Sequence, residues 1–186
     1  MTMIKKLAVL ATATAAFAAT PAMAQDSNSD GTASVNIVAP LSLANTASLD
    51  FGTIVLPTVA TTGTVIVDSA GLRTCPAGFT CTAAGTSAAA YTLTATENVG
   101  VTITVPDTVS IANGNGDNLT VDLLPESGVL GSDATQTGND FALTMPDNPT
   151  GSSSVYAFSF GGSIALADTT PDGAYSGTIT VDADYQ

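Results

Sequence analysis

The chain has 186 residues, of which 16 are acidic and only 3 are basic, and it contains neither His nor Trp. Nucleic acid and anionic membranes bind proteins through Lys and Arg, so a net charge of −13 argues against both as partners. Apolar residues make up 45% of the chain and charged residues only 10%, which excludes a disordered polyelectrolyte. The length suits one domain.

The first 24 residues have the pattern of a secretory signal peptide. Lys5 and Lys6 precede an apolar stretch over residues 7–19, and a small-x-small motif ends at Ala24, where we expect cleavage. The apolar stretch is shorter than the ~20 residues that span a bilayer, so we expect no transmembrane segment in the mature chain. The predicted location is therefore the periplasm, the cell surface or the extracellular space.

Alternation of apolar and polar residues with a period of two dominates the rest of the chain. Each such run predicts a β-strand with one face on a core and a Thr or Asp face in water. No apolar stripe with helical spacing competes with this pattern. We therefore expect an all-β protein, an antiparallel immunoglobulin-like β-sandwich of about nine short strands, with a small β-barrel as the alternative. The alternating runs cover residues 33–43, 91–95, 99–105, 119–123 and 179–185.

Turn-forming residues separate these runs. The Asn- and Gly-rich stretch 113–118 predicts a hairpin connection. Residues 125–139 contain few apolar side chains and read as a long surface loop. After the signal peptide we expect a flexible polar arm over residues 25–32 and a single β-sandwich domain over residues 33–186.

The only two cysteines, Cys75 and Cys81, predict a disulfide, because close cysteines in an exported protein are usually bonded. A redox-active pair is the less favoured alternative, since such pairs usually have two intervening residues and open a helix. A zinc site is excluded by the lack of further Cys or His ligands.

Neither a cofactor nor a catalytic residue emerges from the sequence. The stretch Asp26 to Gly31 resembles the first half of a calcium loop, but Ile37 occupies the twelfth position, where such a loop needs Glu. Without His, and without Lys once the signal is removed, no Ser has a base to activate it. Paired Asp and Glu carboxylates could in principle serve a glycosidase as acid and base. No aromatic platform accompanies them, since Trp is absent and aromatic residues are few. We expect no metal site and no enzyme.

Five segments carry a resemblance to a known family. They read ASVNIVAPL from Ala33, LDFGTI from Leu49, YTLT from Tyr91, VTITVP from Val101 and GAYSGTITV from Gly173. Over nearly the whole mature chain these segments resemble a family of exported bacterial proteins known as domain of unknown function 4402.

More distantly, the chain is similar to chaperone–usher fimbrial subunits. The similarity rests on the penultimate Tyr185 and on Gly173, the fourteenth residue from the end. It implies a subunit that lacks one strand, whose groove is filled by the N-terminal arm of a neighbour. Two alternatives stay open: either residues 33–43 are donated to a neighbour, or the domain is self-complete.

These observations favour an exported structural or adhesion protein, a fimbrial or pilus-like subunit that assembles by strand donation. The alternative is a self-contained secreted binding module with an unknown ligand. The expected partners are proteins: further copies of the chain, related subunits or a periplasmic chaperone. The residues expected to form the assembly strands are Val35, Ile37, Ala39, Leu41, Gly173, Ile179, Val181, Ala183 and Tyr185.

Overall fold

The computed structural model describes residues 29–82, 85–125 and 134–186, which contain fifteen β-strands and no helix. A compact unit runs from Ile37 to Gln186, and a separate stretch ends at Asn36. The predicted signal peptide lies outside the described residues, as does the first half of the calcium-like stretch from Asp26. Within the described ranges, no helix is long and apolar enough to cross a membrane.

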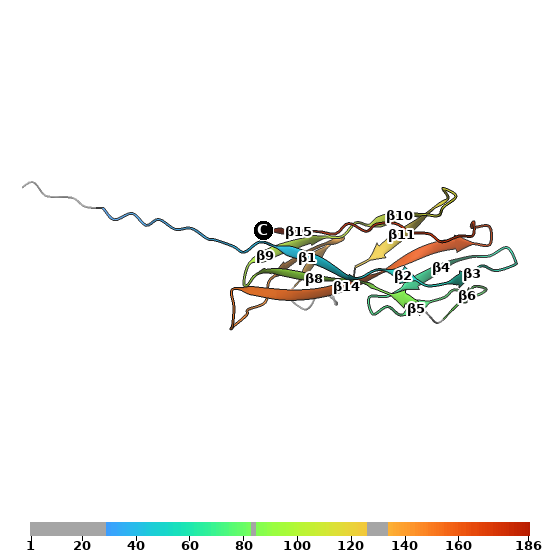
Figure 1. Ribbon diagram of the computed structural model, residues 1–186, viewed down its shortest axis with the longest axis horizontal. Helices are drawn as coiled ribbons and strands as arrows, with labels where there is room; N and C mark the ends of the chain where they lie inside the picture. Colours follow the sequence, from blue (N-terminus) through green and yellow to red (C-terminus); the bar gives the residue numbers. More distant parts are fainter. Residues whose placement is uncertain (1–28, 83–84, 126–133) are drawn as a thin grey trace, which may run out of the picture. The chain divides into compact units, whose positions relative to one another are not determined.

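The larger sheet has seven strands (Figure 1). Five of them follow one another along a main path of paired neighbours. Of the two remaining strands, one pairs with the second half of β14 and the other pairs with that strand in turn. In spatial order the main path runs β1 (Ser42–Ala47), β8 (Ala89–Thr96), β14 (Ser153–Ala167), β11 (Asn118–Leu124) and β10 (Thr108–Ala112), with β4 (Thr62–Val67) and β5 (Arg73–Thr74) as the extension.

The smaller sheet has four strands, and two short ladders stand apart from both sheets. Every strand pair described is antiparallel. The smaller sheet runs β12 (Thr135–Thr137), β13 (Asp140–Thr144), β9 (Gly100–Thr104) and β15 (Asp182–Tyr185), and the short ladders pair β2 (Asp50–Phe51) with β7 (Thr86–Ser87) and β3 (Ile54–Val55) with β6 (Thr80–Cys81).

The core lies between the two sheets. Leu93 of the larger sheet and Ile103 and Phe141 of the smaller one are fully buried in the same cluster. Tyr91 stacks on Phe158 with ring centroids 5.5 Å apart. Burial of each such side chain stabilises the fold by about 1.5–3 kcal/mol. The prediction of an antiparallel β-sandwich is thus confirmed.

Strand β14 was not predicted, although it is the longest. Its first half pairs with β8 and its second half with β4 and β11. At the change of partner lie Gly161 and Gly162. A Cβ atom on Gly161 would lie 1.9 Å from the carbonyl oxygen of Val67, so the close approach of β4 requires glycine there.

The prediction of a strand over residues 33–43 is wrong for most of that stretch. The first strand begins at Ser42, and the side chains of Val35 and Ile37 are 82% and 83% exposed instead of packing on this chain's core. A strand needs a neighbour for its backbone hydrogen bonds. β8 offers no free edge, because it already pairs with β1 and with β14.

The structure confirms the other alternating runs, in whole or in part. Strands β8 and β11 cover the runs at 91–95 and 119–123, and β9 covers residues 100–104 of the run at 99–105. The hairpin at 113–118 joins β10 to β11. The run at 179–185 is confirmed in part, since only Asp182–Tyr185 forms a strand. Residues 125–139 include β12, and the middle of that stretch lies outside the described residues.

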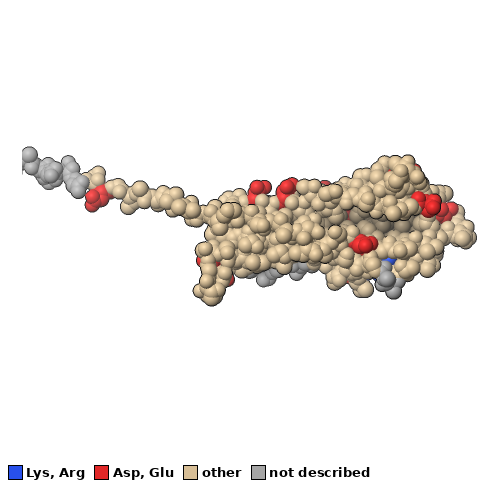
Figure 2. Space-filling model, viewed as in Figure 1, with Lys and Arg blue, Asp and Glu red and all other residues tan. Residues whose placement is uncertain are grey.

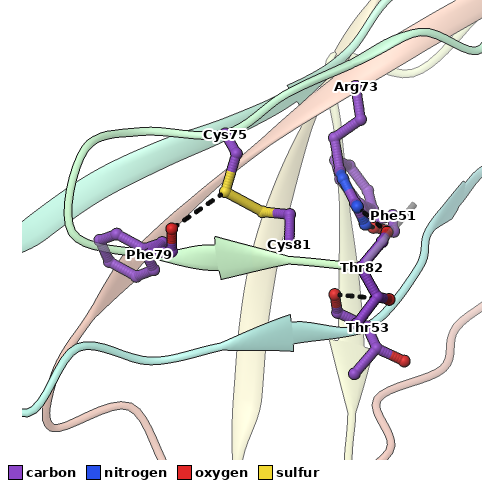
Figure 3. Close-up of a disulfide and its surroundings, with 7 residues drawn as sticks. All are labelled: Phe51, Thr53, Arg73, Cys75, Phe79, Cys81 and Thr82. Atoms are coloured by element: carbon purple, nitrogen blue, oxygen red, sulfur yellow. Dashed lines mark hydrogen bonds between the residues drawn. A yellow bond between two sulfur atoms is a disulfide. The ribbon is translucent and has the colours of Figure 1, made fainter. Parts of the chain in front are cut away.

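Cys75 and Cys81 are bonded to each other, as predicted, with their Cα atoms 6.2 Å apart (Figure 3). The bond closes a small loop between β5 and β6, in which the Phe79 amide donates to the Pro76 carbonyl over 3.2 Å. Disulfides persist in oxidising compartments, so the bond is compatible with an exported protein.

Replacing Gly161 with Ala should lower the free energy of unfolding by about 3 kcal/mol or more, because the backbone of β4 would have to move away from β14. Gly114→Ala is the matched control. That glycine has open space around it, and its replacement should change stability by less than about 0.5 kcal/mol. Urea unfolding of both variants gives the comparison, and equal stabilities would contradict the assigned packing at β14.

Replacing both cysteines with Ser should lower the free energy of unfolding by about 2 kcal/mol, the loop-closure entropy of so short a ring. The fold itself should persist, because neither cysteine is among the fully buried side chains of the core. Urea unfolding followed by far-ultraviolet circular dichroism measures both quantities. An unfolded variant would show that the bond is essential to the sandwich.

Candidate functional site

An apolar groove of about 1000 Å³ opens in the compact unit. Its floor is one face of three neighbouring strands, β10, β11 and β14. The register places Val109 opposite Val121 and Val121 opposite Ile164, so these side chains share that face. The floor side chains are Val109, Ile111, Leu119, Val121, Ile164 and Leu166.

Two irregular segments flank the floor, residues 48–56 on one side and residues 170–177 on the other. The second segment is held against β10 by paired backbone hydrogen bonds of 2.9 and 3.0 Å between Ala112 and Ser176. Gly177 follows, where a Cβ atom would lie 2.6 Å from the Ser110 carbonyl oxygen. Figure 2 shows the surface hollowed between two such ridges. The groove therefore has two backbone walls and an apolar base.

The groove stays open because the second layer of the sandwich is interrupted there. β15 pairs with β9 only from Asp182 onward, and residues 177–181 form no strand. On the opposite wall, β2 and β3 have only two residues each. Val109, Ile111 and Leu119 are consequently only half buried, unlike the core residues of the neighbouring strands. Partly exposed apolar side chains that are contiguous mark a surface for a partner.

Charge at the groove is confined to its walls. Asp50 lines the first wall, where its Oδ1 accepts a hydrogen bond of 2.7 Å from the Gly52 amide, and Asp172 lines the second. Desolvation, and after it the negative charge of Asp117, raise the pKa of the Tyr175 phenol, which therefore stays neutral at physiological pH. In the described part of the chain, no three carboxylates or cysteines gather as metal ligands. An uncharged, apolar occupant suits this groove.

Residues 29–38 form an extended segment outside any strand, which we call the arm (Figure 1). Its alternate residues Ala33, Val35 and Ile37 are exposed. No charged residue occurs between Gly31 and Leu49, although the whole chain is strongly acidic. At Ala33, Val35 and Ile37 the arm thus offers the period-two apolar face of a strand.

The base of the arm is fixed by hydrogen bonds between Ala39, Thr96 and Tyr185. The Tyr185 hydroxyl donates to the Ala39 carbonyl over 2.7 Å and accepts from the Thr96 amide over 2.9 Å. The Ala39 amide donates to Thr96 Oγ1 over 2.6 Å. The penultimate residue therefore anchors the point where the arm leaves the sandwich.

The predicted assembly residues lie in different parts of the structure. Val35 and Ile37 lie on the arm, whereas Ala39 and Leu41 lie at its base. Gly173 lies in a groove wall. The C-terminal residues Ile179, Val181, Ala183 and Tyr185 pack against the core of their own domain. Their role in assembly stays a prediction.

Sequence reasoning missed the groove. Leu119 and Val121 belong to an alternating run that predicts a core face, because alternation marks an inward face and does not reveal whether another layer covers it. The only signal was the pair of irregular stretches around Gly52 and Gly173, where the alternation fails on both sides of the groove.

Comparison with known families gives one match, to a family described as "Domain of unknown function (DUF4402)", over residues 41–185. No curated protein and no solved structure matches the chain. The matched residues include every strand of both sheets and exclude the arm. Because the match covers most of its length, the chain belongs to the DUF4402 family.

Proposed function

We propose that the protein is an exported structural subunit that assembles with other copies or related subunits by strand addition and does no catalysis. The arm of one subunit enters the apolar groove of the next and completes its sandwich. The observation that carries this proposal is the arm itself, with its alternate apolar side chains exposed to 82% at Val35 and 83% at Ile37.

The exposed arm is costly for an isolated monomer. Each large apolar side chain left in water forgoes about 1.5–3 kcal/mol of stabilisation. An extended segment that pairs with a second chain recovers this energy, since its backbone gains ladder hydrogen bonds and its alternate side chains enter pockets. An arm with a random sequence would have no reason to place its apolar residues at every second position.

The groove offers what such a segment needs. Three strands provide an apolar floor, and a backbone wall flanks each side. A strand rises about 3.3 Å per residue, so residues 33–39 would span about 20 Å. Ala33, Val35 and Ile37 would then face the floor while Ser34 and Asn36 face water.

Charge favours the neutral arm as the occupant. Two copies of a chain with a net charge of −13 repel each other through their surfaces. The stretch from Gly31 to Leu49 is uncharged, so its burial between the acidic walls adds no further repulsion and requires no desolvation of a charge. A periplasmic chaperone that supplies a strand of the same kind would be a further partner.

Export is part of the proposal. It is supported by the pattern of the first 24 residues and by the disulfide, which suits an oxidising compartment. The competing function is a secreted binding module with a small or extended ligand in the groove. That module would stay a monomer whatever the sequence of its arm.

Ile37→Asp should abolish assembly of the mature protein without altering its fold, because a carboxylate buried in the groove would cost several kcal/mol. Asn36→Asp is the matched control, since it adds the same charge one position away on the face that remains in water. Size-exclusion chromatography with light scattering measures the mass, and circular dichroism reports the fold. We expect assemblies for the control and monomers for Ile37→Asp.

Two results would contradict the proposal. The unchanged mature protein could be monomeric at high concentration, as the binding module requires. Alternatively, Ile37→Asp and Asn36→Asp could assemble equally well, which would show that the apolar face of the arm is not the contact.

A further inference from the structure

We propose that Arg73 is a positioning residue that holds the groove wall at residues 48–56 where an incoming strand can reach the floor. This inference rests on the proposed function of the groove. Arg73 is the only basic residue after Lys6 in a chain with 16 acidic residues, yet both of its described hydrogen bonds go to backbone carbonyls.

Arg73 acts where the ladder behind the wall is interrupted. Phe51 pairs with Thr86 in one short ladder, and Ile54 pairs with Cys81 in the next. Between them Gly52 has a φ of 65°, which breaks the strand. One guanidinium nitrogen of Arg73 donates to the Phe51 carbonyl over 2.6 Å, and the other donates to the Thr82 carbonyl (Figure 3). The side chain thus joins β2 to the residue that follows β6, at the point where the ladder is interrupted.

The same residue ties the wall to the floor. Arg73 belongs to β5, where it pairs with Val67 of β4, and β4 pairs along β14, which contributes Ile164 to the floor. Phe51 lines the groove from the wall. One path from wall to floor therefore runs through the guanidinium and two strand ladders.

Two features make arginine suitable for this position. Its planar guanidinium presents several N–H donors in a fixed fork, so it can donate to two carbonyls in different directions at once. Its charge also strengthens each hydrogen bond relative to a neutral donor. A lysine at the same place keeps the charge but loses the fork.

The disulfide provides a second connection between the same elements. Cys75 lies two residues after Arg73, and Cys81 belongs to β6, the partner strand of Ile54 in the wall. The bond limits how far β6 and the wall can separate from β5. It does not reach the interrupted segment around Gly52, where the Thr82 amide donates to the Thr53 carbonyl over 3.1 Å and Arg73 holds the neighbouring Phe51 carbonyl.

The test uses the full mature chain with Ile37→Asp, a monomer that keeps an empty groove, titrated with a synthetic peptide of residues 31–41. Arg73→Lys in this background should weaken peptide binding at least tenfold by calorimetry. Ser159→Ala is the matched control. Ser159 Oγ also donates to a backbone carbonyl, that of Ser69, over 2.9 Å, but it does not line the groove. The control should bind the peptide within twofold of its parent.

Each outcome decides the question. Peptide binding by Arg73→Lys as tight as by its parent would overturn the inference, and so would an equal loss in Ser159→Ala. Loss of the fold in Arg73→Lys, seen by circular dichroism, would show that the residue supports the whole domain and would also overturn it. Failure of the Ile37→Asp parent to bind the peptide would instead refute the proposed function.

Discussion

Pairing along β14 is the constraint on which both the sandwich and its groove depend. This strand pairs with β8 over its first half and with β4 and β11 over its second. The change of partner requires that β4 end against the backbone of Gly161, where no side chain fits. The second half of β14 thereby pairs with β11, whose other neighbour β10 carries the half-buried side chains Val109 and Ile111 of the groove floor.

The groove and the arm have complementary features: the groove has an apolar floor, and the arm has exposed apolar side chains at alternate residues. Where the smaller sheet stops, three strands of the larger sheet keep an apolar face that the chain itself covers only with irregular segments. The segment before β1 has exposed apolar side chains at alternate residues, and at its base the Ala39 carbonyl accepts a hydrogen bond from the Tyr185 hydroxyl. The proposed strand addition between copies would supply a strand to this apolar surface.

The sequence predicted the strands whose two faces differ clearly in polarity. β8 and β9 alternate Thr with apolar residues, and both were identified together with the β-sandwich and the disulfide. β14 also alternates, with apolar or aromatic side chains at Tyr156, Phe158 and Phe160. It was missed because Gly161 and Gly162 resemble a turn, whereas they permit close packing in the middle of a strand.

The site was harder to predict than the fold, because period-two alternation tells which face of a strand is apolar and not which chain covers it. Residues 33–38 illustrate this limit: their pattern is that of a core strand, yet their side chains are exposed. Likewise, the role of Arg73 depends on contacts with Phe51 and Thr82, which come from distant parts of the chain.

Hydrogen–deuterium exchange on the assembled mature protein, compared with the dilute monomer, tests the central claim most directly. Backbone amides of residues 33–38 belong to no strand in the part of the chain that the structure describes, and in the monomer they should exchange within seconds. In the assembly they should become protected by orders of magnitude, together with the amides of the groove walls. Arm amides that exchange equally fast in both states would contradict the account, because an arm that pairs with a neighbouring subunit cannot leave its backbone in water.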